Sequence, residues 1–157
     1  MKRTHQRRAP AAATVPQVRR LWTCPKCGAR FVQRNLSHSC VRRSVDDFLR
    51  DKPVAAVRLF ERFVDEVRKL GPVTLHPVKT RVALMVDVRF AAINRFGDDF
   101  IDGHLWLKQR QASGKFRRVE GLAGKDFIHH FRMSSPAFLD TEFRRYLEMA
   151  YAIGERR

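Results

Sequence analysis

Cysteine is scarce in this chain of 157 residues: there are three, and all of them lie between positions 24 and 40. An odd number of cysteines leaves one thiol over, which argues against a disulfide framework. The first 20 residues carry basic side chains but no apolar segment of the kind that marks a secretory leader. We therefore expect a cytoplasmic protein whose thiols are reduced.

Long apolar runs and several catalytic signatures are also missing. No apolar run approaches the roughly 18 residues that cross a bilayer, so we expect no membrane partner. There is no glycine-rich phosphate loop, no G-x-S-x-G elbow and no H-E-x-x-H helix. The acids are scattered, and no D/E-x-K triplet of the nuclease type is present. The sequence therefore does not indicate an enzyme of any of these classes, and an enzyme of another class stays open as an alternative.

The three cysteines and one histidine have the spacing of a metal site. Cys24 and Cys27 form a C-x2-C pair, and after ten residues His38 and Cys40 form an H-x-C pair. Two such pairs facing each other match a closed Cys3His zinc site, in which four ligands surround the metal tetrahedrally. The alternative is that three incidental cysteines lie beside a surface histidine.

The ligand count favours a structural zinc ion over a catalytic one. A catalytic zinc typically has three protein ligands and leaves one position to water, whereas this cluster offers four. No acidic residue precedes Asp46, so no general base is available nearby. The residues between the two pairs have room only for a short hairpin or one helical turn, and a module this small depends on its metal to fold.

Acidic residues are missing from the whole amino-terminal quarter. Residues 1–43 contain 11 lysines and arginines and no aspartate or glutamate, while the remaining residues contain 21 against 16. Such a cationic segment attracts polyanions, so nucleic acid is the expected partner and an anionic lipid surface is the second choice. The side chains expected to contact phosphates here are Arg30, Arg34, Arg42 and Arg43, with Trp22 and Phe31 available to stack on unpaired bases. Each observation also has a simpler interpretation. The many arginines could reflect a GC-rich genome, which enriches arginine over lysine without selection for binding. Phe31 could form the apolar core of the module instead of contacting a base.

The composition changes near Arg43, where we place a boundary. It divides the chain into a disordered basic arm (1–20), a zinc knuckle (21–43) and a domain over 44–157 that is large enough for its own core. A helix is predicted from Asp51-Lys52-Pro53 to the Gly71-Pro72 stop, because its apolar residues recur at intervals of three and four. A closing helix is predicted from Ser135-Pro136 to Gly154.

Between these helices the apolar period falls to two. In residues 81–93, Val82, Leu84, Val86, Val88 and Phe90 share one face, which predicts a strand pair or one bent strand. Residues 73–79, 100–108 and 126–133 are further strand candidates, separated by turn residues. The strands follow too closely for crossover helices, so we predict an α+β fold with an antiparallel sheet, one face under the two helices and the other open.

Several of these segments resemble a known family. WTCPKCG and HSC, the run from FERFVDEV to VRFAAI, the IHHFRM strand and the final LEMAYAIG are similar to bacterial proteins with domain of unknown function 5655 (DUF5655). The likeness covers nearly all of residues 22–154, and some members of that family carry the same knuckle in front. The resemblance implies the fold and the boundaries but no activity, because the family has none established.

The open face of the predicted sheet offers a second cationic surface. Lys79, Arg81, Arg89 and Arg132 lie on neighbouring strand candidates and are expected to form an anion-binding patch. Four histidines lie nearby: His76, His104, His129 and His130. For each histidine alone, the simpler interpretation is a partly buried strand residue with a hydrogen bond.

Together these observations predict a zinc protein that binds nucleic acid without catalysis and without sequence readout. The arm and knuckle would grip phosphates, and the sheet face would add Lys79, Arg81 and Arg89. Two alternatives stay open: a phosphoester-cleaving enzyme with His129 or His130 as acid or base, and a protein-protein adaptor in which zinc stabilises a docking surface. The choice between DNA and RNA and the oligomeric state are not specified.

Overall fold

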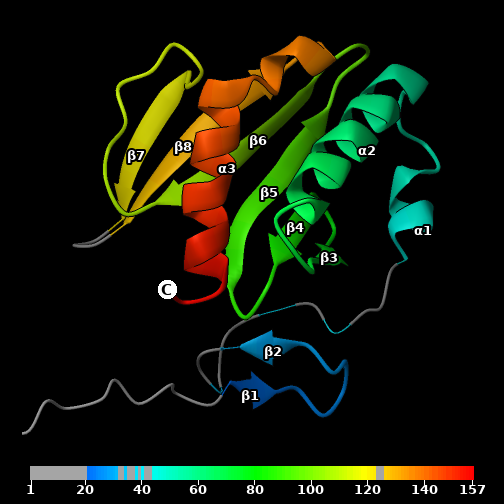
Figure 1. Cartoon of the computed structure of the whole chain (residues 1–157). Helices are drawn as coiled ribbons and strands as arrows, with labels where there is room; N and C mark the ends of the chain where they lie inside the picture. The colour runs from blue at the N-terminus through cyan, green and yellow to red at the C-terminus, as the bar shows by residue number, and fades with distance from the viewer. Residues whose placement is uncertain (1–20, 32–33, 35–37, 39, 41–43, 123–125) are drawn as a thin grey trace, which may run out of the picture.

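The computed structural model describes residues 21–31, 34, 38, 40, 44–122 and 126–157. The predicted basic arm (1–20), Arg42 and Arg43 lie outside the described residues. Figure 1 shows a short hairpin and, above it, a sheet with two long helices on one face. In the described part of the chain, no helix has the length and apolar character needed to cross a membrane.

A six-stranded antiparallel sheet forms the centre of the main domain, in the order β3-β4-β5-β6-β8-β7. Its strands are β3 (Thr74–Pro77), β4 (Val82–Met85), β5 (Arg89–Phe96), β6 (Ile101–Leu107), β7 (Arg118–Leu122) and β8 (Asp126–Met133). The α+β class and the antiparallel sheet are confirmed, as are the four predicted strand segments. Residues 81–93 form a strand pair, since the chain turns between Met85 and Arg89. The edge strand β7 was not predicted.

The first long helix, α2 (Val54–Arg68), confirms the predicted amphipathic segment. It begins directly after Pro53, whose fixed φ suits the start of a helix. Its buried stripe lies on the sheet and consists of Ala56, Leu59, Phe60, Phe63, Val64 and Val67. A short preceding helix, α1 (Val45–Leu49), was not predicted; the Ser44 hydroxyl caps it by accepting from the amide of Asp47 at 2.9 Å.

The closing helix, α3 (Thr141–Gly154), ends where predicted but begins later. The expected start at Ser135 was wrong, because Ser135 makes no side-chain cap and precedes only a short 3-10 helix, Pro136–Phe138. Asp140 is the actual cap, since its Oδ1 accepts from the amide of Phe143 at 3.0 Å. The Ser135-Pro136 pair, which has the pattern of a helix start, thus placed the predicted first residue five positions too early, at Pro136 instead of Thr141.

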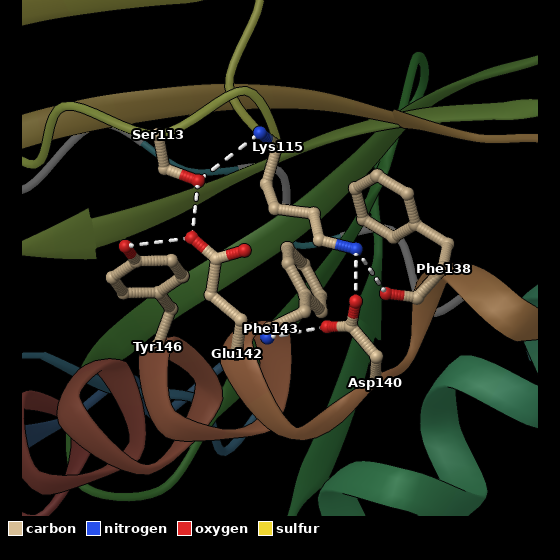
Figure 2. A network of polar contacts seen from close by, with 7 residues as sticks. All are labelled: Ser113, Lys115, Phe138, Asp140, Glu142, Phe143 and Tyr146. Atoms are coloured by element: carbon tan, nitrogen blue, oxygen red, sulfur yellow. Dashed lines mark hydrogen bonds and ion pairs between the residues drawn. The ribbon is translucent and has the colours of Figure 1, made fainter.

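A polar network fastens the β6–β7 connection to the start of α3, as Figure 2 shows. The Lys115 ammonium donates to Asp140 Oδ2 at 2.5 Å, so the capping carboxylate is also neutralised. The Ser113 hydroxyl donates to Glu142 Oε1 at 2.7 Å, and the Tyr146 hydroxyl reaches the same oxygen at 3.3 Å. The Lys115 and Ser113 contacts join segments 25 and 29 residues apart in the chain, whereas the Tyr146 contact lies within α3.

The sheet has two unlike faces. The face under α2 and α3 is the apolar core, with Leu84, Ile93, Leu105 and Phe131 almost fully buried. Directly paired residues of antiparallel strands point to the same face, and one such row crosses the whole sheet on the other side. This row is His76, Ala83, Ala92, His104, His130 and Arg118. We call the face that carries this row the outer face.

Candidate metal centre and adjoining cationic cavity

The amino-terminal module is a two-stranded antiparallel hairpin, β1 (Trp22–Thr23) and β2 (Arg30–Phe31), with the first cysteine pair in its turn. The amide of Cys24 donates to Ala29 O and the amide of Gly28 donates to Cys24 O, both at 2.8 Å. Gly28 has a φ of 73°, a left-handed conformation that glycine adopts without a steric penalty. The loop therefore folds back so that Cys24 and Cys27 face the same side.

The four predicted ligands come together in space. The ligand atoms of Cys24, Cys27, His38 and Cys40 all lie within 4.8 Å of one another, and Cys24 is buried. The Cys24 and Cys40 sulfurs are 3.7 Å apart, and Cys40 Sγ is 3.3 Å from His38 Nε2.

These distances suit a tetrahedral metal ion better than a disulfide. Ligand bonds of about 2.3 Å to sulfur and about 2.0 Å to nitrogen place two sulfurs of a tetrahedron about 3.8 Å apart and a sulfur and a nitrogen about 3.5 Å apart. A disulfide would bring the two sulfurs to about 2.05 Å, and all three cysteines are free thiols. The cluster is therefore a possible metal site whose donor set fits zinc.

The thiols differ in their affinity for protons. Burial works to raise the pKa of Cys24, but the backbone amides of Cys27 and Lys26 and the side chain of His38 outweigh it and lower the pKa to about 6. Burial and the neighbouring thiols Cys24 and Cys27 raise the pKa of Cys40 to about 11. The first thiolate thus forms readily, and its negative charge opposes a second one close by.

Aromatic packing holds the histidine in the cluster. The rings of Phe31 and His38 have centroids 4.3 Å apart, and Trp22 lies 6.3 Å from both. Phe31 is 8% exposed, so it belongs to the module's own core, one of the two interpretations left open for it. Packing of this kind orients the imidazole toward the sulfurs.

A cavity of about 550 Å³ lies between this module and the outer face of the sheet. Arg30, Phe31 and His38 line it from the module side, and Arg30 pairs with Asp87 across it at 3.6 Å. From the sheet side it is lined by His76, Val78, Lys79, Thr80, Arg81, Ala83, Met85, Asp87, Val88, Arg89 and Trp106. The hairpin in the lower part of Figure 1 thus forms one wall of a site on the main domain.

Besides Arg30, three of the predicted phosphate-binding residues, Lys79, Arg81 and Arg89, line this cavity. Among the residues that the structure describes, none of the three forms an ion pair with a carboxylate within 4.0 Å. Burial, and then the charge of Arg81, lower the pKa of Arg89. The cavity therefore carries excess positive charge.

Arg89 is the most enclosed of these cations. Its guanidinium carbon lies 5.0 Å from the ring centroid of Trp106, a cation-π contact. Its Nε is buried without a hydrogen-bond partner, and so is the indole nitrogen of Trp106. Leaving a polar group in this state costs free energy, which makes the pair a candidate for contact with a ligand.

Other predicted cations lie apart from the cavity. Arg34 is exposed in a turn of the module. Arg132 lies on β8, where it donates to both oxygens of Asp102 at 2.7 and 2.8 Å and covers the Phe100 ring at 3.7 Å. The expectation that Arg132 belongs to the same patch was wrong, because a bidentate pair already neutralises it.

The four histidines do not converge on one site. His76 lines the cavity, and burial lowers its pKa. His104 is buried on the outer face, and its Nδ1 is 3.0 Å from the Asn94 amide nitrogen. His130 is next to it, with a ring centroid distance of 5.7 Å, and its Nε2 is 3.2 Å from Glu120 Oε1.

His129 points to the opposite face. It is fully buried and packs against Phe116 at 4.7 Å. Its Nε2 accepts from the amide of Gln111 at 2.9 Å, and its Nδ1 lies 3.3 Å from Phe127 O. Both ring nitrogens are therefore used structurally, and the hypothesis that His129 is an acid or base on the outer face was wrong.

Trp106 was given no binding role from the sequence, although this residue lines the cavity beside Arg89. In the segment IDGHLWL, Leu105 and Leu107 enter the core, so His104 and Trp106 must share the other face. The alternation thus contained a signal, but placing Trp106 beside Arg89 requires the pairing of β5 with β6. Sequence alternation alone does not specify that register.

Comparison with curated proteins and with solved structures finds no match. A family model, described as domain of unknown function (DUF5655), matches residues 45–154. This range begins at α1 and ends with α3, so it spans the whole sheet and leaves the Cys3His group on its amino-terminal side. The chain therefore belongs to the DUF5655 family.

Proposed function

We propose that the chain is a zinc-dependent, non-enzymatic nucleic-acid-binding protein. In this proposal residues 1–20 are a basic arm, residues 21–43 a structural zinc knuckle and residues 44–157 a domain whose outer face completes the binding surface. Its place of action is the cytoplasm, where thiols stay reduced. The observation that carries the proposal is the Cys3His group directly beside a cavity lined by Lys79, Arg81 and Arg89, three cations that pair with no carboxylate of the described residues.

The metal part is supported by the donor set and by the size of the module. Three sulfurs and one imidazole nitrogen fill the four positions of a structural zinc ion. The described hairpin has only two residues in each strand, and Phe31 is its main buried apolar side chain. So little buried area cannot stabilise a fold by itself, and metal binding would supply the missing free energy.

The nucleic-acid part is supported by charge. The formal net charge is +16, and the first 43 residues contain no acid that would offset it. We assign phosphate contacts to Arg30, Arg34, Arg42, Arg43, Lys79, Arg81 and Arg89. Seven such contacts with a single strand give a log-log salt slope of about −5, which is roughly a thousandfold loss of affinity between about 50 and 200 mM salt.

The alternative of phosphoester cleavage has less support. Among the described histidines, His130 combines a place on the outer face with a carboxylate neighbour, Glu120. Arg118 pairs with the same carboxylate and competes for it. No cluster of acids that would hold a catalytic metal ion is found in the described residues, where the Cys3His group is the one candidate.

The proposal is tested by native mass spectrometry with and without a chelator, followed by oligonucleotide titrations of both forms. We expect one zinc ion per chain and binding that weakens steeply with salt and is lost on chelation. Cys24→Ser removes one ligand and should reproduce chelation, whereas Ser44→Ala, outside the cluster, should retain the metal. A metal-loaded protein that binds no oligonucleotide even at about 50 mM salt would contradict the proposal and favour the adaptor alternative.

A further inference from the structure

The cavity beside the metal centre contains more cations than carboxylates: Arg30, Lys79, Arg81 and Arg89 line it, with Asp87 as the one acid among its described lining residues. Arg89 is half buried, pairs with no carboxylate and has Arg81 nearby as a second cation. Asp87, the carboxylate that lines the cavity, pairs with Arg30. A bound anion would reduce the repulsion between Arg81 and Arg89, so the electrostatics favour a ligand with at least one negative group.

Besides the cations and a few polar residues, the cavity wall is largely apolar and aromatic. Phe31 from the hairpin and Ala83, Met85 and Trp106 from the sheet line it together with the cations. A site with an apolar wall and a few convergent charged groups is typical of small-molecule pockets, whose volumes are about 300 to 1,000 Å³. The ligand therefore combines an anionic group with a flat or apolar body.

Size decides between classes of nucleic acid. A cavity of about 550 Å³, closed on one side by the hairpin, has room for a single nucleotide unit but not for a double helix, whose paired bases stay stacked and present only their edges in the grooves. Unpaired bases commonly stack on aromatic side chains while arginine and lysine hold the backbone.

We propose that this cavity binds one unpaired nucleotide, with its phosphate at Lys79, Arg81 and Arg89 and its base against the wall formed by Trp106, Met85 and Phe31. The inference rests on the proposed function and specifies it: the preferred polymer is single-stranded, and the hairpin is a wall of the nucleotide site. The nucleotide is either free or part of a strand, and the experiment separates the two.

Tryptophan emission reports on the site directly. The chain has two tryptophans, so a Trp22→Phe background leaves Trp106 as the sole reporter. The probes are thymidine 5′-monophosphate, thymidine, inorganic phosphate, a short oligothymidylate and a blunt duplex of equal length. We expect Trp106 quenching by the monophosphate and by the oligothymidylate, and weaker effects from the other three.

Arginine-to-glutamine variants test whether Arg89 and Arg81 hold the phosphate, with Arg145 as the matched control. Arg89→Gln should weaken binding of both effective probes roughly 10- to 100-fold, because a charge-assisted contact is lost. Arg145→Gln removes the same charge from an exposed position on α3 and should leave binding unchanged. Arg81→Gln serves as a second variant, because Arg81 is less enclosed than Arg89. Thermal melting checks that each variant is folded.

The outcomes separate this inference from the proposed function. Oligonucleotide binding that leaves Trp106 emission unchanged, or that Arg89→Gln and Arg145→Gln affect equally, overturns the inference and keeps the proposed function. Equal affinity for inorganic phosphate and the monophosphate overturns the assignment of a nucleotide. Arg89-dependent binding of the monophosphate without oligonucleotide binding supports the site and overturns the proposed function.

Discussion

His104 should make the stability of the domain depend on pH. Its side chain is 6% exposed on β6, and Asn94 donates to its Nδ1 at 3.0 Å, which requires an unprotonated nitrogen there. Burial, followed by the positive charges of His130, Arg89 and Arg81, lowers the pKa of His104 from 6.5 to about 3. The folded protein therefore holds His104 neutral where the unfolded chain protonates it.

The sign and size of the effect follow from linkage. Below pH 6.5 the unfolded chain binds the extra proton, so stability is complete above this pH and is lost as the pH falls toward 3. Between about pH 6.5, where this histidine is already half protonated in the unfolded chain, and about pH 5, the loss of stability from this one residue is about 1.6 kcal/mol. Because this window ends well above the folded-state pKa, the loss depends almost entirely on the unfolded-state value.

Urea denaturation of the wild type and of His104→Gln at both pH values measures this contribution. The glutamine carbonyl can still accept from Asn94, so the hydrogen bond is kept. The two proteins should therefore differ in the pH dependence of their unfolding free energy only through the proton that His104 binds in the unfolded chain. We expect the wild type to lose about 1.6 kcal/mol more than the variant on acidification. His76 and His129, whose pKa values are also lowered by burial, contribute equally to both proteins and cancel.

An equal loss in the two proteins would refute the reasoning, because it would mean that His104 is protonated equally in the folded and unfolded states. An NMR titration of the imidazole gives an independent check. The ring should stay neutral in the folded protein down to about pH 5.

Three substitutions test the packing of the domain by thermal or urea unfolding. Asp140→Ala should destabilise the fold by about 1 kcal/mol or more, because α3 loses its cap and Lys115 loses its partner; an unchanged melting temperature would contradict this role. Gly103→Ala places a methyl group 2.8 Å from Ala92 O and should cost about 1 to 3 kcal/mol, whereas Gly114→Ala, with open space around it, should not. Tyr151→Phe removes the hydroxyl that donates to Pro72 O at 2.8 Å and should cost about 1 kcal/mol, with no change in zinc content.

Elements with strong periodicity were predictable from local pattern. The stripe of α2 and the alternation of β4, β5, β6 and β8 reflect which side chains enter the core, and this is visible in the order of the residues. The edge strand β7 was missed because RVEGL has no alternating apolar face, and its burial is low throughout. Its strand conformation comes from hydrogen bonds to β8, which are a property of tertiary pairing.

The start of α3 shows why boundaries are less predictable than elements. Both Ser135 and Asp140 are good capping residues, and both precede apolar positions. The structure chooses Asp140, whose carboxylate accepts from the helix and also meets the ammonium of Lys115. That second contact comes from a distant loop, which no local pattern reveals.

The spacing of Cys24, Cys27, His38 and Cys40 was by itself enough to predict a metal-ligand group, because short-range chain geometry brings such pairs together. The alternation of residues 82–90 likewise determined that Met85 and Arg89 leave the core. Only the tertiary structure decided that Arg89 lies on Trp106 and that Arg132 is neutralised by Asp102. Those contacts depend on the register of β5 with β6 and of β6 with β8, which is set by long-range packing and not by neighbouring residues.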